Sequence, residues 1–437
     1  MKDLGRWLIS LMALPCPRNM LSSAALLSLL AASSAISAPL PSSHDNALER
    51  LLSRAATTQS DAMVIWKDGR ELGHYYASGK PPGAIELMSV TKSVVALAVG
   101  QLVADGRIKS LDQPVADFYP EWRQGQKANV TIRMIMNHTS GIQNVLRAGV
   151  EIYPAPDAIQ LALAAELSSI PGDIPSYNNK AVNLLSGIIE KAAGKPLDAF
   201  LRAGLFKDMD IQPGPWKKDK AGHPYAMAGL PLTAADLGKL GELVLNKGNW
   251  HGKQQLPSTY IDALMHSQTA DGMALLWWIA PQYRHFATDP AAFPMLRNQG
   301  VPEPTVTALE KGLPGAFFDD EESMMAGIKK ALGKDWRATL QSDLISRGIG
   351  PYRLFKVTTG PTAAYFGNGD GGQYLVVVPF ARIVAVRQID AAGDAEKEGQ
   401  GFENFVDSVL AVARAYAAQS VGALARTPIL LGAEEEK

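Results

Sequence analysis

Cysteine is nearly absent from this sequence of 437 residues. The only cysteine, Cys16, lies in an N-terminal stretch that predicts an export signal. Basic residues there precede the apolar run Leu21 to Ala38, which ends in small residues. Cleavage is expected near residues 35–38. The mature chain would then contain no thiol, which excludes both a disulfide framework and a cysteine nucleophile.

The segment 1–38 is therefore predicted to be a signal peptide, and the protein is expected to be exported, with a periplasmic location. An uncleaved membrane anchor is the alternative. The run of 18 residues is rich in serine and alanine, and a membrane span needs about 20 apolar residues. We expect no stable membrane insertion after cleavage. Translation from Met1 or from Met20 fits this pattern.

Several classes of partner and of binding or catalytic site are not expected, because the sequence lacks their characteristic residues. The 42 Lys and Arg residues nearly balance the 43 Asp and Glu residues, and there is no long basic tract, so nucleic acid is not an expected partner. The seven histidines form no H-E-x-x-H pattern and no close pair, so neither a metal nor another cofactor is expected. No G-x-S-x-G is present, which argues against an α/β-hydrolase elbow. The run Gly367 to Gly372 matches G-x-G-x-x-G but leads into a strand, so a dinucleotide site is not expected.

The periodicity of the chain predicts an α+β fold. Two β-rich runs around "KDGR" within 61–79 indicate a hairpin, and three further strands are expected within 362–388. The part between about 110 and 270 is typical of helices, with the clearest at 181–194 and 233–248, and an amphipathic helix follows from residue 402. Strands from both chain ends are expected to form one antiparallel sheet flanked by helices, beside a mainly helical lobe, with a site between the two.

One lysine stands at the mouth of a helix that is otherwise apolar. Ser89 and Lys92 are three residues apart, so both side chains face the same side of a helix that is expected to stop at Gly106. Desolvation would favour a neutral amine, which could accept the proton of the serine hydroxyl. A helix-capping serine with a snorkelling lysine would give the same spacing.

Two later motifs carry groups that would complete such a site. Tyr177 and Asn179 form a Tyr-x-Asn just before a helix, and a tyrosine beside the Ser–Lys pair could relay a proton. The glycine-rich turn that begins at Gly367 could let backbone N–H groups approach a substrate oxygen, as in an oxyanion hole. A packed loop tyrosine and a β-bulge are the alternatives.

In this order the motifs resemble the serine β-lactamase and penicillin-binding-protein superfamily, particularly its class C β-lactamase-like branch with esterases and 6-aminohexanoate-dimer hydrolases. The stretches 89–122, 130–142 and 228–248 carry most of the similarity. The resemblance implies a β-lactamase/transpeptidase-like domain over 45–420, with a sheet lobe at about 45–108 and 355–420 and a helical lobe at about 109–354.

The resemblance also implies roles for individual residues. Ser89 would be the nucleophile, Lys92 its general base and Tyr177 the second proton carrier. Asn179 would contact the substrate. The third motif of the family would fall at Gly367–Asn368–Gly369, and the backbone N–H groups of Ser89 and Asp370 would form the oxyanion hole.

This third motif departs from the family, because it has neither lysine nor histidine. A β-lactam carboxylate would lack its usual cationic partner, so a neutral ester is the better substrate, unless a residue such as Lys356 supplies the charge. The stretch Val357 to Gly360 is a second candidate for the motif. The segment 281–352 matches no pattern of the family and is expected to be an insertion that lids the cleft, or a surface elaboration.

Three further residues remain open or are assigned a packing role. His138 is expected to be structural. Trp277 and Trp278 could wall an acyl pocket or belong to the core.

The expected function is an exported serine hydrolase that cleaves a small ester or amide through an acyl-enzyme on Ser89. The alternative is a slowly acylating, non-hydrolytic protein of the penicillin-binding or sensor type. Steady turnover of an ester separates the two, because a sensor would stop after one burst.

Overall fold

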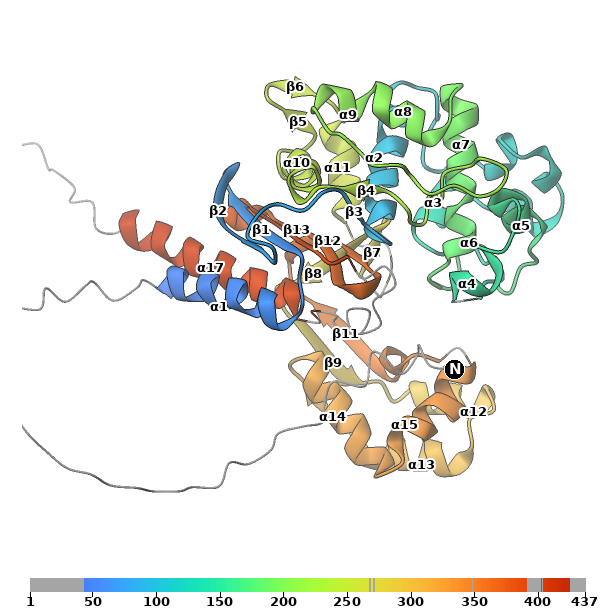
Figure 1. Cartoon of the computed structure of the whole chain (residues 1–437). Helices are drawn as coiled ribbons and strands as arrows, with labels where there is room; N and C mark the ends of the chain where they lie inside the picture. Colours follow the sequence, from blue (N-terminus) through green and yellow to red (C-terminus); the bar gives the residue numbers. More distant parts are fainter. Residues whose placement is uncertain are drawn as a thin grey trace, which may run out of the picture. The chain divides into compact units, whose positions relative to one another are not determined.

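A computed structural model describes residues 43–424, except 146, 267–268, 270–271, 348, 391–401 and 403. Its centre is an antiparallel sheet of seven strands in the order β2-β1-β14-β13-β12-β8-β7 (Figure 1). The strands are β1 (Ala62–Lys67), β2 (Arg70–Tyr76), β7 (Met273–Ala274), β8 (Trp277–Pro281), β12 (Thr362–Gly369), β13 (Gln373–Val378) and β14 (Ile383–Gln388). Strand β1 pairs with β14, so strands from the N-terminal and the C-terminal part of the chain form one sheet, as predicted.

The first hairpin shows why this sheet starts where it does. Its two-residue turn is Asp68–Gly69, and both residues have positive φ, at 52° and 73°. That backbone twist matches the twist of paired strands. In β1 the side chains alternate, so that Val64 faces one core, whereas Met63 and Ile65 face the other.

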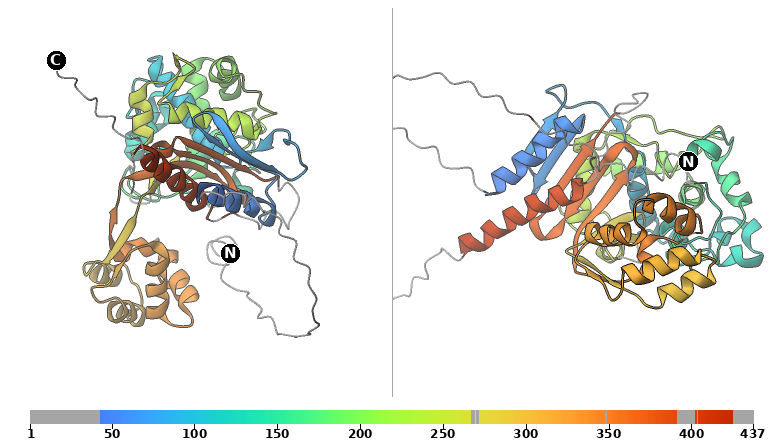
Figure 2. Two further views of the ribbon diagram at one scale, coloured as in Figure 1. Left: turned by 90° about the vertical axis from the view of Figure 1, so that its left-hand side faces the viewer. Right: turned by 90° about the horizontal axis from the view of Figure 1, so that it is seen from below.

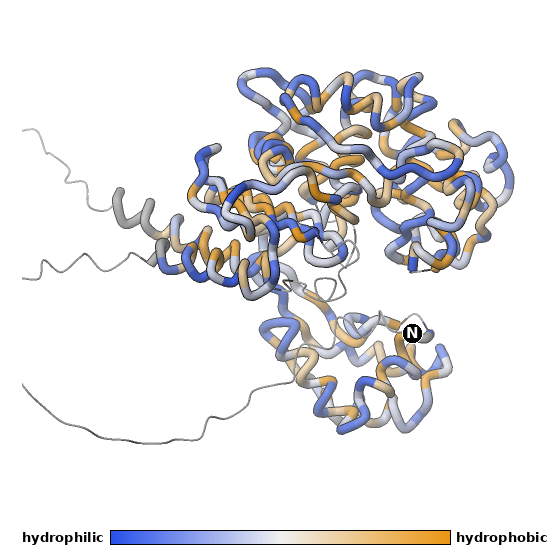
Figure 3. The backbone as a smooth tube through the Cα atoms, in the orientation of Figure 1, coloured by the Kyte–Doolittle hydropathy of each residue, from blue (hydrophilic) through white to orange (hydrophobic). Residues whose placement is uncertain are grey.

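Helices cover both faces of the sheet. Helix α1 (Ser43–Thr57) and helix α17 (Phe405–Leu424) lie side by side on one face (Figure 2). Helix α10 (Ala234–Leu245) and helix α2 (Val90–Ala104) pack on the opposite face. Hydrophobic residues concentrate in the strands and in the helices that face them (Figure 3).

Helix α2 is apolar on all sides because it is buried on all sides. It ends just before Gly106, whose φ of 67° is the left-handed conformation expected after a helix end. The helices of the central part of the chain are α3 (Ile132–Met136), α4 (Ala148–Glu151), α5 (Ala158–Ala164), α6 (Asn179–Val182), α7 (Leu184–Ala193), α8 (Leu197–Ala203), α9 (Leu205–Asp208) and α11 (Ser258–Leu264). Of these, helices α7 and α8 contact helix α2. Among the described residues of this part of the chain there are two short strand pairs, β3 (Ile85–Glu86) with β4 (Pro231–Leu232) and β5 (Asn249–Trp250) with β6 (Lys253–Gln254), and three isolated β-bridges.

The segment between β8 and β12 forms a small substructure of its own (Figure 1). It has a three-stranded sheet in the order β10-β9-β11. Its elements are β9 (Arg284–Thr288), α12 (Ala292–Asn298), α13 (Glu303–Gly312), β10 (Phe317–Phe318), α14 (Glu321–Leu332), α15 (Trp336–Thr339) and β11 (Phe355–Thr359). These strands were not predicted from the sequence.

The predicted signal peptide lies outside the described residues. Within the part of the chain that the structure describes, no helix is both long and apolar enough to cross a membrane.

Candidate active site

Ser89 stands at the entrance of helix α2. The preceding Met88 has a φ of 47°, so the chain turns sharply before the helix begins. Ser89 is the N-cap residue, but its side chain makes no capping hydrogen bond. Its hydroxyl is therefore not occupied as it would be in a simple helix cap.

Lys92 is buried beside Ser89, with only 3% of its surface exposed. Its Nζ lies 2.9 Å from Ser89 Oγ and donates to the carbonyl oxygen of Met227 over 2.7 Å. Burial lowers the pKa of Lys92 well below its ordinary value, because desolvation disfavours the charged amine. A snorkelling lysine is excluded by this geometry, and a neutral amine one hydrogen bond from the serine is able to accept its proton.

Tyr177 completes a cluster of three side chains. Lys92 Nζ lies 5.0 Å from the centre of the Tyr177 ring, and the Tyr177 hydroxyl lies close to the Ser89 side chain. Burial raises the pKa of Tyr177 to about 12, and the carboxylate of Asp370 adds to the rise. The phenol thus keeps its proton at neutral pH and is available as an acid.

His138 packs against the ring of Tyr177. The two rings lie 4.5 Å apart, and His138 Nδ1 accepts the backbone N–H of Asn178 over 2.9 Å. Burial lowers the pKa of His138 to about 3, helped by the nearby Lys92. The imidazole is therefore neutral. Its Nε2 is buried and has no hydrogen-bond partner among the described residues.

The glycines of the third motif bring strand β12 against the Ser89 turn. A Cβ on Gly369 would lie 2.6 Å from the carbonyl oxygen of Leu87, and a Cβ on Gly367 would lie 2.8 Å from Ser93 Oγ. Only glycine allows this approach. Asp370 follows directly at the end of the strand, near enough to act on the Tyr177 hydroxyl.

The same strand offers an open edge at these glycines. On the β8 side the pairing of β12 ends at Phe366, which lies opposite Trp278. On the other side β12 stays paired with β13 as far as Gly369. Among the described strands, none pairs with Gly367–Gly369 on the β8 side, so their backbone groups are left for another partner.

Asn179 begins helix α6, two residues after Tyr177. Its Oδ1 is buried and has no hydrogen-bond partner among the described residues. A buried acceptor of this kind is costly unless a ligand or water satisfies it. The structure thus brings Ser89, Lys92, Tyr177 and Gly369 together, and Asn179 lies two residues after Tyr177 in the chain.

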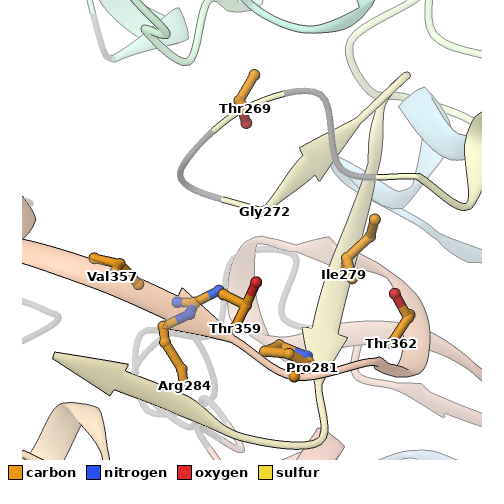
Figure 4. A pocket seen from close by; sticks show the side chains of 9 residues that line it. Thr269, Gly272, Ile279, Pro281, Arg284, Val357, Thr359 and Thr362 are labelled. Carbon is orange, nitrogen blue, oxygen red and sulfur yellow. The ribbon is translucent and has the colours of Figure 1, made fainter.

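The second candidate for the third motif lies elsewhere. Val357 and Thr359 belong to β11, which pairs with β9, and they line a cavity of about 210 Å³ with Arg284 and Ile279 (Figure 4). The Arg284 side chain extends into this cavity (Figure 4). Ser89, Lys92 and Tyr177 are not among the residues that line it.

The buried ion pair of Lys180 with Glu151 was missed by the sequence analysis. Lys180 follows Tyr177 by three residues, and its Nζ lies 2.9 Å from Glu151 Oε1. No spacing rule connects two residues so far apart in the chain, although the charged residue in a run that becomes a buried helix was a usable signal.

One other polar group has the composition of a metal site. Asp157, Asp219 and His223 lie close together in the described part of the chain. Their oxygens already accept backbone N–H groups: those of Ile159 and Gln160 for Asp157, and those of Ala158 and His223 for Asp219. The group therefore caps helix α5 and closes a turn.

Comparison with known proteins identifies the family of this chain. The family model of the β-lactamases matches residues 47–400. The chain is 34% identical to esterase EstB of Burkholderia gladioli over 192 residues, which cover 38% of this chain and 48% of EstB. It is 23% identical to a 6-aminohexanoate-dimer hydrolase of Paenarthrobacter ureafaciens over 247 residues, 52% of this chain and 62% of that protein. The matches thus span less than two thirds of these relatives.

A solved structure agrees with the fold. The β-lactamase/D-alanine carboxypeptidase of Pseudomonas syringae superimposes with a TM-score of 0.54 over 85% of this chain and 99% of its own, at 15% identity. The fold is therefore β-lactamase/transpeptidase-like, as the sequence predicted. With the family match over most of the described residues, the chain belongs to the β-lactamase family.

Proposed function

We propose that this protein is a serine hydrolase that cleaves a small ester or amide through an acyl-enzyme on Ser89. The observation that carries the proposal is the 2.9 Å separation between Ser89 Oγ and the buried Lys92 Nζ. The relatives named as an esterase and as a 6-aminohexanoate-dimer hydrolase support both bond types as substrates.

In the first half-reaction, Ser89 Oγ attacks the carbonyl carbon while the neutral amine of Lys92 takes its proton. The resulting oxyanion accepts hydrogen bonds from the backbone N–H groups of Ser89 and Asp370. The bond to the leaving group then breaks, and the leaving alcohol or amine takes the proton of Tyr177. The ammonium of Lys92 returns a proton to Tyr177, so the charges balance.

In the second half-reaction, water attacks the acyl-enzyme. The neutral amine of Lys92 accepts its proton and returns it to Ser89 Oγ as the acid product leaves. The raised pKa of Tyr177 and the lowered pKa of Lys92 suit these roles, since one group enters protonated and the other enters neutral.

The open edge of β12 supports a substrate slot along Gly367–Gly369. Asn179 Oδ1, buried and unpaired among the described residues, would accept an N–H or O–H of the substrate. The third motif, Gly367–Asn368–Gly369, supplies no cationic side chain to this slot. Asp370 adds a negative charge beside the slot. A neutral small molecule is therefore the expected substrate.

Export to the periplasm is part of the proposal, supported by the signal pattern in residues 1–38 and by the absence of a thiol after Cys16. Amino-terminal sequencing of the periplasmic fraction tests it. A mature protein that begins between residues 36 and 39 is expected. An uncleaved protein in the membrane fraction would contradict it.

The nucleophile is tested by covalent labelling with a fluorophosphonate, alongside steady-state turnover of a nitrophenyl ester. Ser89→Ala should abolish labelling and lower turnover by about 10³-fold or more, because covalent catalysis is lost. Ser78→Ala, which changes an exposed serine in a turn, is the matched control and should behave as the wild type. Labelling that persists in Ser89→Ala would refute the proposal. A single burst without turnover in the wild type would favour a sensor.

A further inference from the structure

We propose that the ion pair between the buried Lys180 and the partly buried Glu151 positions Tyr177, by locking residues 142–145 and 147–151 against the turn that carries this tyrosine. The inference rests on the proposed function, in which Tyr177 protonates the leaving group. Lys180 and Glu151 are positioning residues in this proposal, since they act through Tyr177 and do not touch the reacting atoms.

The ion pair is largely shielded from solvent, with 20% of the Glu151 side chain exposed. Only 2% of the Lys180 side chain is exposed, and its Nζ donates to Glu151 Oε1 and to Gln143 Oε1, each over 2.9 Å. The same oxygen of Glu151 accepts the backbone N–H of Val145 over 3.0 Å. One ammonium and one carboxylate thus fix Gln143 and Val145.

Neighbouring residues fix the rest of this segment to the Tyr177 turn. Asn144 Nδ2 donates to the carbonyl oxygen of Tyr177 over 3.1 Å. Asn178 Nδ2 donates to the carbonyl oxygen of Ile142 over 2.6 Å, while its Oδ1 accepts the N–H of Ala181 over 2.8 Å. The Tyr177 carbonyl and the following Asn178 are therefore both bonded to residues beside Gln143 and Val145, which Lys180 and Glu151 hold.

This turn needs such support because its own helix is short. Helix α6 contains only the four residues Asn179–Val182, too few to fix its direction by its own hydrogen bonds. Removing one member of a buried ion pair leaves the other charge without compensation, so the segment would rearrange. A shift of about 1 Å in a proton donor is enough to impair catalysis.

The expected defect is selective for the leaving group. A nitrophenolate leaves without a proton, whereas an alkoxide or amine needs one from Tyr177. Fluorophosphonate labelling needs only Ser89 and its base. Loss of Tyr177 positioning should therefore impair alkyl esters and amides strongly, and the other two probes only slightly.

The experiment measures kcat/KM for an alkyl ester and for the nitrophenyl ester of the same acid, with the labelling rate, in five variants: Lys180→Met, Lys180→Arg, Glu151→Gln, Tyr177→Phe and Lys180→Met with Tyr177→Phe. The control is Lys191→Met, because Lys191 also gives a hydrogen bond to a carbonyl, that of Phe118, in the same helical region. Thermal unfolding of each variant shows that it is folded.

In Lys180→Met we expect about a 30-fold loss for the alkyl ester and less than about a 3-fold loss for the nitrophenyl ester and for labelling. Lys180→Arg should recover part of the alkyl-ester activity. In the Tyr177→Phe background, Lys180→Met should cause no further loss, because both changes remove one function. Lys191→Met should match the wild type.

The inference would be overturned in favour of a general structural role by either of two results. One is an equal loss for the alkyl ester, the nitrophenyl ester and fluorophosphonate labelling. The other is a further loss of alkyl-ester activity when Lys180→Met is added to Tyr177→Phe. If Lys180→Met does not fold, Lys180→Arg and Glu151→Gln decide the question by the same ratio of alkyl to nitrophenyl activity. A wild type that neither labels nor turns over any ester would refute the proposed function itself. An active wild type with an unchanged ratio in the variants would refute only this inference.

Discussion

Trp278 lies stacked on Tyr177, with ring planes 13° apart and ring centres separated by 6.3 Å. Its neighbour Trp277 points the other way, is 1% exposed and donates its indole N–H to the carbonyl oxygen of Ser93. Of the two tryptophans that the sequence left open, one belongs to the core and the other stands at the edge of the slot beside Gly367.

Replacing these two tryptophans should therefore have different effects. Trp278→Ala should lower kcat/KM for a hexanoate ester about 10-fold and for an acetate ester less than about 2-fold, because it removes apolar contact area from the longer chain. Trp277→Ala should lower the free energy of unfolding by about 3–5 kcal/mol. Ester kinetics and urea unfolding on both variants are the measurements. An equal loss for both esters in Trp278→Ala would exclude an acyl wall.

Activity should rise with pH through the lowered pKa of Lys92, since the amine acts only when neutral. It should then stay level until the pKa of Tyr177, about 12, is approached. No inflection near pH 6.5 is expected from His138, whose pKa of about 3 keeps it neutral. Lys92→Arg should lose about 10³-fold in kcat/KM, because a guanidinium keeps its proton at working pH. Activity within about 10-fold of the wild type would exclude the base role of Lys92.

The buried amine should also reduce stability. The pKa of Lys92 is lower in the folded state, so below the ordinary lysine pKa the unfolded state binds a proton that the folded state does not. Its destabilising effect is absent above that value and grows as the pH falls toward the lowered pKa. Lys92→Met should raise the unfolding free energy at pH 7 by about 1–3 kcal/mol, the usual cost of a buried polar group. Urea unfolding at pH 7 and pH 10 tests this, and the gain should be smaller at pH 10.

Gly369→Ala should impair catalysis through the backbone alone. The new Cβ would lie 2.6 Å from the carbonyl oxygen of Leu87 and must push the end of β12 away from Ser89. A loss of about 10²-fold in kcat is expected, typical for a lost oxyanion donor. Gly83→Ala is the matched control, since its Cβ would meet nothing within 4 Å. Comparable kcat for both variants would place the oxyanion hole elsewhere.

A neutral short-chain ester should have at least about 100 times the kcat/KM of a cephalosporin. The missing cation at Gly367–Gly369 costs a charge-assisted hydrogen bond of about 1.5–3 kcal/mol, or about 10- to 100-fold in affinity, and the carboxylate of Asp370 repels the drug. Both substrates should be measured on one preparation. A preference for the cephalosporin would mean that another residue, such as Lys356, supplies the positive charge.

The parts of this molecule that the sequence predicted are those set by local pattern. The turn at Asp68–Gly69, the all-apolar helix α2 and the strands after residue 362 each depend on neighbours in the chain. The three-residue spacing of Ser89 and Lys92 is also local, and the hydrogen bond between them follows from it. The short strands β7 to β11 were missed because their partners, not their composition, make them strands.

The side chains and carbonyl groups around the site could not be predicted from the sequence either, because they too come from distant parts of the chain. The carbonyl of Met227 that receives the Lys92 amine is 135 residues away in the chain. The partner of Lys180 is Glu151, a residue of another helix. The side chains of Trp277 and Trp278 point to opposite faces of β8, and only the tertiary structure determines which face meets the core. Such contacts exist only after the fold has formed.

The pairing of β1 with β14 sets the order in which this protein can mature. Ala62 pairs with Gln388, which is synthesised more than 300 residues later. Strand β1 therefore cannot find its partner until the chain has been made as far as β14. Strand β12, which carries Gly367 and Gly369 to the Ser89 turn, is held in place by β13 and thus by β14. Contacts so distant in sequence form slowly. The Ser89 turn therefore lacks its opposite wall throughout most of translation, and catalytic competence should appear only as the last strands close the sheet.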